Sequence, residues 1–193
     1  SVVLRVVCIV LAVLIAFSRM YLGVHTPLDV GVSFLVTAAL VMAVYPLMEE
    51  ADRRPWVLTR TILAMAVCSG AFVGYLYLRG DIGTTAEDTV NYLDALANGW
   101  KLLGATLGLL VSNVFDRKYV RFETDAVWWA QLIKLVVGFG LLLAIRAGLK
   151  APLIALLGGN EVIAGGIRYL LVVLFAGGVW PLTFWWFSRL GRR

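Results

Sequence analysis

The sequence predicts an all-α fold, a polytopic integral membrane bundle of about six transmembrane helices. Hydrophobic residues make up 61% of the 193 residues and charged residues only 15%, whereas soluble domains are roughly 45 to 50% apolar. This composition excludes a soluble globular enzyme, and no basic domain is present that would bind nucleic acid. Strand-type alternation is absent from the sequence, so an outer-membrane barrel is not expected.

Six apolar segments are long enough, or nearly so, to cross a bilayer, which takes about 20 residues. Each is expected to be a helix, because lipid offers no partner for free backbone groups and a helix satisfies its own. The six segments are 2–17, 27–47, 57–78, 95–115, 127–149 and 167–188.

The first two segments frame a short loop. Segment 2–17 is a few residues short at its amino end, and the chain begins with Ser1 without the features of a signal peptide. We therefore expect the chain to be the carboxyl-terminal part of a longer protein. Segment 27–47 opens with Pro27, which suits the first helical position, and Thr26 before it suits the N-cap.

The other four segments contain small residues, a lysine or a proline that predict how each helix packs or bends. Small residues recur at helical spacing within 57–78 and 95–115, namely Ala66, Gly70 and Gly74, then Gly104 and Gly108. Such residues let helices approach closely, and packing within one chain is favoured over a dimer face. Lys134 lies inside segment 127–149, where a snorkelling side chain is favoured over a transport pathway. Pro181 predicts a tolerable kink in segment 167–188.

Basic residues set the expected orientation, because cytoplasmic loops carry the excess of Lys and Arg. Ten of them lie at one set of helix ends, six lie at the other, and Lys134 lies within a segment. The first set is expected in the cytoplasm, so both termini of the chain would face inward and the loop after segment 2–17 would face outward. The chain has no Asn-x-Ser/Thr acceptor, which favours a bacterial cell membrane.

That outward loop brings together an arginine, the only histidine of the chain and an aspartate: Arg19, His25 and Asp29. Asp29 would lie in the first helical turn, where its carboxylate can hold one ring N–H of His25 and leave the other nitrogen free to act. The helix amino end attracts an anion, and Arg19 can clamp the same anion. The pattern predicts a phosphate site with a nitrogen nucleophile.

Each of these residues also has a structural interpretation. Thr26 and Asp29 have the spacing of a capping box, which would make Asp29 a helix-start residue without a catalytic role. Arg19 could snorkel from the end of the first helix, and His25 could be an ordinary interfacial imidazole.

The pattern Ser18-Arg19, five residues, His25, three residues, Asp29 resembles the third signature motif of the type 2 phosphatidic acid phosphatase and haloperoxidase superfamily. The resemblance implies that His25 is a nucleophile that forms a phosphohistidine, that Asp29 orients and charges it, and that Arg19, with Ser18, binds phosphate oxygens. Membrane members of this family remove phosphate from lipid phosphates or polyprenyl pyrophosphates without a metal ion or other cofactor.

The same resemblance divides the chain. Residues 1–47 would be the carboxyl-terminal part of the phosphatase core, and residues 48–193 would be additional transmembrane helices, about four in number.

The chain lacks the two earlier motifs of the family, a Lys followed after six residues by Arg-Pro, and a Ser-Gly-His whose histidine protonates the leaving group. Loss of a general acid typically costs about 10²- to 10⁴-fold in rate. We therefore expect the chain alone to be inactive and the complete protein to be a phosphatase. The alternatives are a noncatalytic relative that binds lipid or acts as a scaffold, and, with less support, a transporter.

Overall fold

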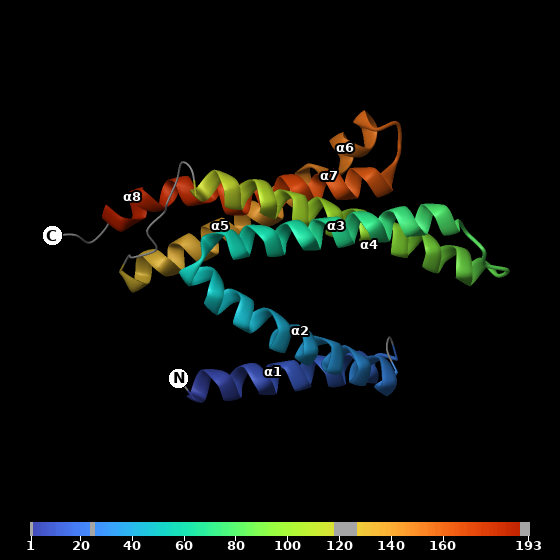
Figure 1. The fold of residues 1–193 in the computed structure, drawn as a ribbon, viewed down its shortest axis with the longest axis horizontal. Coiled ribbons are helices and arrows are strands. Elements are labelled where there is room, and N and C mark those ends of the chain that lie inside the picture. Colours follow the sequence, from blue (N-terminus) through green and yellow to red (C-terminus); the bar gives the residue numbers. More distant parts are fainter. Residues whose placement is uncertain (1, 24–25, 118–126, 190–193) are drawn as a thin grey trace. The chain divides into compact units, whose positions relative to one another are not determined.

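The computed structural model describes residues 2–23, 26–117 and 127–189, and within them every regular element is a helix (Figure 1). The chain divides into two compact units, Ser1–Pro55 and Trp56–Arg193. The predicted all-α membrane fold is confirmed, and each unit is described by itself below.

The first unit is a hairpin of two helices, α1 (Val2–Tyr21) and α2 (Pro27–Arg53). Both are apolar along their length, and neither buries its membrane-length window inside the protein, as expected of surfaces that lie against lipid. Helix α1 runs four residues beyond the predicted segment. It ends in a tight turn in which Gly23 has a φ of 67°, a conformation that favours glycine.

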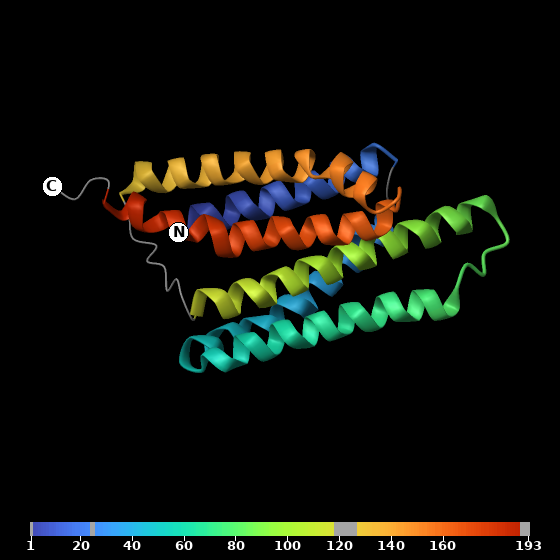
Figure 2. The same ribbon diagram turned by 90° about the horizontal axis from the view of Figure 1, so that it is seen from above.

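The second unit begins with two long helices, α3 (Pro55–Arg79) and α4 (Ala86–Phe115). Helix α5 (Trp128–Gly148) and the short α6 (Lys150–Leu156) follow. The last segment is α7 (Glu161–Leu174), continued by a π-helical turn η2 (Phe175–Val179), a 3-10 turn η3 (Trp180–Thr183) and α8 (Phe184–Arg189). Figure 2 shows α4 and the α7 segment running in the same direction.

Five stretches of the described residues are long and apolar enough to cross a membrane: Val2–Tyr21, Pro27–Ala51, Pro55–Arg79, Trp129–Leu156 and Glu161–Trp186. The protein is therefore a multi-pass membrane protein. Helix α4 is 30 residues long but is not among the five, so the predicted span at 95–115 stays a prediction.

Glycines bring α4 and α7 into close contact. A Cβ on Gly104 would collide with the carbonyl oxygen of Gly166, and a Cβ on Gly108 would lie 2.8 Å from the carbonyl oxygen of Leu170. Packing of Gly104 and Gly108 within one chain is thus confirmed. The prediction is weaker for α3, where a Cβ on Gly74 would meet nothing within 4 Å.

The α7 segment is irregular around Pro181, in line with the predicted kink. The π turn precedes Pro181, which lacks the N–H that a regular helix would use. Lys134 on α5 differs from the prediction, because its side chain is 5% exposed and does not snorkel to the surface. Its ammonium nitrogen lies 4.5 Å from the centre of the Phe184 ring, a cation–π contact that offsets part of the cost of burial.

Candidate functional site

The predicted site lies at the turn between α1 and α2. Arg19 is in the last turn of α1, and Ser18 precedes it. The hydroxyl of Ser18 donates to the carbonyl oxygen of Ile15 at 2.8 Å, a bond within its own helix. Ser18 is absent from the lining of the groove described below, so its predicted contact with phosphate stays a prediction.

A complete capping box starts α2. The Thr26 hydroxyl oxygen accepts from the Asp29 backbone N–H at 3.2 Å, and Asp29 Oδ2 accepts from the Thr26 backbone N–H at 2.8 Å. The Thr26 hydroxyl also donates to Asp29 Oδ2 at 2.9 Å. The structural interpretation of Asp29 is therefore correct. It does not exclude a catalytic role, because an ionised carboxylate has about four acceptor positions.

Arg19 and Asp29 line one groove between α1 and α2, with a volume of ≈ 420 Å³. The remaining lining residues are mostly apolar: Ala12, Ile15, Ala16, Val30, Ser33, Phe34 and Thr37. The groove therefore joins a cation and a carboxylate at its polar end to an apolar channel beside them. That combination suits a phosphate attached to an alkyl chain.

Sequence reasoning missed two hydroxyl residues of this groove. Ser33 and Thr37 follow Asp29 at intervals of four residues, so all three lie on one face of α2. The spacing was visible in the sequence, but nothing in it showed that this face turns toward α1. His25 and Val24 lie outside the described residues, so the structure does not test the predicted nucleophile.

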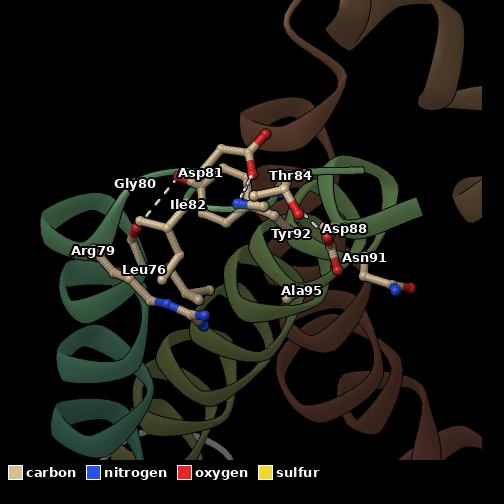
Figure 3. Close-up of a pocket in the computed structure, with 11 residues that line it drawn as sticks. Leu76, Arg79, Gly80, Asp81, Ile82, Thr84, Asp88, Asn91, Tyr92 and Ala95 are labelled. Carbon is tan, nitrogen blue, oxygen red and sulfur yellow. Dashed lines mark hydrogen bonds between the residues drawn. The ribbon is translucent and has the colours of Figure 1, made fainter. Parts of the chain in front are cut away.

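A second polar pocket, of ≈ 350 Å³, lies where α3 and α4 meet (Figure 3). Its carboxylate Asp88 forms another capping box, accepting from the Thr85 hydroxyl at 2.8 Å and the Thr85 backbone N–H at 3.1 Å. These bonds from Thr85, with one from the Thr84 N–H, hold the pKa of Asp88 below its ordinary value. Tyr92 donates to the carbonyl oxygen of Leu76 at 3.3 Å. Asp88 and Tyr92 thus bond to neighbouring parts of the two helices and their loop.

No group of three or more His, Cys, Asp or Glu residues that could hold a metal ion occurs within the described residues. The candidate site is thus the groove with Arg19 and Asp29.

Comparison with known proteins places both parts of the chain in one superfamily. Residues 1–53 match the model of the PAP2 superfamily, and residues 100–193 match the model described as PAP2 superfamily phosphatase, transmembrane extension. No curated protein and no solved structure matched the chain. The two matched ranges cover most of the chain, and the first includes the groove and the loop with His25. The chain therefore belongs to the PAP2 superfamily of membrane phosphatases.

Proposed function

We propose that this chain carries the nucleophile and part of the phosphate clamp of a metal-independent phosphatase acting on lipid phosphates or polyprenyl pyrophosphates. One observation carries the proposal: Arg19 and Asp29 line the same groove, and the loop with His25 joins the two helices that form it. The distribution of Lys and Arg supports a location of this loop at the outer membrane face.

The reaction would proceed in two displacement steps. A ring nitrogen of His25 attacks the phosphorus atom while the bond from phosphorus to the lipid oxygen breaks, and Arg19 stabilises the charge on the phosphoryl oxygens. Asp29 accepts the N–H of the other ring nitrogen and stabilises the positive imidazole. Water then attacks the phosphohistidine, the P–N bond breaks, and inorganic phosphate leaves with His25 restored.

The shape of the groove supports a long-chain substrate. Its α1 wall runs from Arg19 back to Ala12, which is about 10 Å of helix at the usual rise per residue. Apolar side chains dominate this wall and the facing part of α2. An alkyl or prenyl chain would therefore lie along the groove while its phosphate stays beside Arg19.

The single histidine limits which leaving groups can depart. His25 cannot be both nucleophile and acid in the first step, and no second histidine is present in the 193 residues. An alkoxide needs a proton as it leaves, whereas p-nitrophenolate is stable as an anion. The expected inactivity of the chain alone therefore applies to lipid phosphates. With p-nitrophenyl phosphate we expect a residual hydrolysis, at least about 10²-fold faster than that of phosphatidic acid, the usual effect of a general acid.

The test uses the purified 193-residue chain in mixed micelles, with p-nitrophenyl phosphate and phosphatidic acid as substrates. His25→Gly should abolish hydrolysis of the aryl ester. Added imidazole should restore p-nitrophenol release and yield N-phosphoimidazole, a product that only a nucleophilic role predicts. Arg5→Gln is the control and should have no effect, because Arg5 is an exposed arginine of α1 that does not line the groove.

Three results would overturn parts of the proposal. Hydrolysis that survives His25→Gly refutes the nucleophile. Equal rates with both substrates refute the need for a general acid but leave the nucleophile intact. A chain that hydrolyses neither substrate, at any enzyme concentration, refutes the residual hydrolysis of the aryl ester.

A further inference from the structure

A charged cavity of ≈ 410 Å³ lies in the second unit, whereas the candidate site belongs to the first. Three helices line it, α4, α6 and α7. Its charged residues are three cations and two carboxylates: Lys101, Lys150, Arg168, Asp94 and Glu161. Both signs of charge thus share one concave surface.

These opposite charges are not paired with each other. None of the five side chains forms an ion pair with a described residue, and the Lys101 ammonium donates instead to the Asn98 side-chain oxygen at 3.0 Å. The Nε atom of Arg168 is buried and has no hydrogen-bond partner among the described residues. Buried polar atoms without partners are rare, and each needs an explanation such as a bound molecule.

The charges are ordered along the helices. Asp94 precedes Lys101 by seven residues on α4, and Glu161 precedes Arg168 by seven residues on α7. Seven residues place the two members of each pair on the same helix face, about 10 Å apart along the axis. Because α4 and α7 run in the same direction (Figure 2), the carboxylate of each pair lies toward the same end of the two helices and the cation of each pair lies toward the other end.

The order of the charges also has a direction relative to the helix ends. The carboxylates lie nearer the amino ends of α4 and α7, where the loops are, and the cations lie farther into the helices. Helical side chains lean toward the amino end, so the long cationic side chains reach back toward the carboxylates. Lys150 at the start of α6 adds a third cation.

We propose that this cavity binds the headgroup of a zwitterionic aminophospholipid, with its phosphate on Lys101, Lys150 and Arg168 and its ammonium on Asp94 and Glu161. In such a lipid the phosphate lies next to the glycerol and the ammonium lies farther out toward water. The cavity presents its charges in the same order. A headgroup with a phosphate and no amine would place negative charge beside two carboxylates without compensation.

Two structural roles compete with this proposal. Glu161 in the first turn of α7 favours the helix dipole, and cations at helix ends often reach the lipid interface. Neither role accounts for the unpartnered Nε atom of Arg168 or for opposite charges that face one cavity without pairing. The two explanations also predict different lipid selectivity.

The experiment titrates the full chain with phosphatidylethanolamine or phosphatidylglycerol of identical acyl chains and measures the apparent Kd by native mass spectrometry. The wild-type chain should bind phosphatidylethanolamine about tenfold more tightly. Glu161→Gln with Asp94→Asn should weaken phosphatidylethanolamine binding about tenfold, or about 1.4 kcal/mol, and leave phosphatidylglycerol unchanged or tighter. Arg168→Gln should weaken binding of both lipids.

Two further variants keep the test decisive. Lys150 is exposed, so Lys150→Gln should fold normally and weaken both lipids even if Arg168→Gln fails to fold. Arg146 on α5 lies over the Tyr169 ring at 6.0 Å and does not line the cavity, so Arg146→Gln should change neither affinity. Wild-type preference for phosphatidylglycerol, or equal loss of both lipids in the carboxylate variant, would overturn the proposal in favour of an unspecific cationic belt.

Discussion

Asp29 has one observed role and one proposed role, and the two can be separated by the size of their effects. It caps α2 through its bonds to Thr26, and it is proposed to orient and charge His25. Two substitutions distinguish these roles. Thr26→Ala removes the hydroxyl of the cap and keeps the carboxylate, whereas Asp29→Asn keeps an oxygen for the Thr26 N–H and removes the charge.

The capping contribution can be worked from the structure. Thr26→Ala removes the acceptor at 3.2 Å and the donor at 2.9 Å, and loss of such a cap costs about 1 kcal/mol. Asp29→Asn loses the favourable charge at an exposed helix start, about 0.3 to 1 kcal/mol. For a chain of this size, 1 kcal/mol corresponds to a Tm lower by about 2 to 4 °C.

The catalytic contribution is expected to be larger. A carboxylate that fixes and charges a catalytic imidazole accounts for about 10²- to 10⁴-fold in rate, which is about 2.7 to 5.4 kcal/mol of barrier. Asp29→Asn should therefore lower p-nitrophenyl phosphate hydrolysis by at least about 10²-fold with a small change in Tm. Thr26→Ala should show a similar Tm change and a much smaller loss of activity.

The chain contains its own matched control. Thr85 and Asp88 form a second capping box at the start of α4, with bonds of 3.1, 2.8 and 3.1 Å. Thr85→Ala and Asp88→Asn should change Tm by amounts similar to the pair at α2 and leave hydrolysis unchanged. If Asp29→Asn reduces activity no more than Asp88→Asn does, Asp29 only caps the helix and the catalytic role is refuted.

Three other predictions follow from the described contacts. Arg19→Lys keeps the charge but loses the bidentate guanidinium, so hydrolysis of p-nitrophenyl phosphate should fall about tenfold; equal rates would argue against phosphate contact. Gly104→Ala must displace the Gly166 backbone and should cost about 1 to 3 kcal/mol in thermal unfolding, whereas Gly74→Ala, with open space around it, should be neutral or stabilising. The lowered pKa of Asp88 adds stability at pH values above its ordinary pKa of 3.8, and this contribution is lost as pH falls through the lower folded pKa. Asp88→Asn should therefore have a flatter Tm profile between pH 5 and 3, and identical profiles would contradict the bonded carboxylate.

Hydropathy predicted the helices of this protein well, because the lipid bilayer itself requires apolar side chains on any helix that crosses it. A span needs apolar side chains along its length whatever it packs against, so α1, α3 and α5 begin or end within a few residues of their predicted bounds. The helix cap of α2 was also predictable, because it depends only on residues that are neighbours in the sequence. Thr26, Pro27 and Asp29 contain within four residues all that the start of α2 requires.

Tertiary contacts were less predictable, because they depend on which helix faces which. The sequence showed the polar spacing of Asp29, Ser33 and Thr37 but not that this face lines a groove with α1. Lys134 was expected to snorkel, but it is buried, and its ammonium lies over the ring of Phe184, fifty residues away in the sequence. The role of His25 and the division of the chain after residue 47 stay predictions.

Helix α4 shows why the hydropathy of a helix and its packing can suggest different answers to whether it spans a membrane. Its 30 residues span about 45 Å, more than the hydrocarbon core of about 30 Å, yet it is less apolar than its neighbours. Except for Leu96, its buried residues are small or hydroxylated: Gly99, Gly104, Thr106, Gly108 and Ser112. Such residues lower the hydropathy of a helix and at the same time permit close approach to α3 and α7. The buried face of α4 therefore lowers its hydropathy for a reason of packing, and its low apolarity is not an argument against a span.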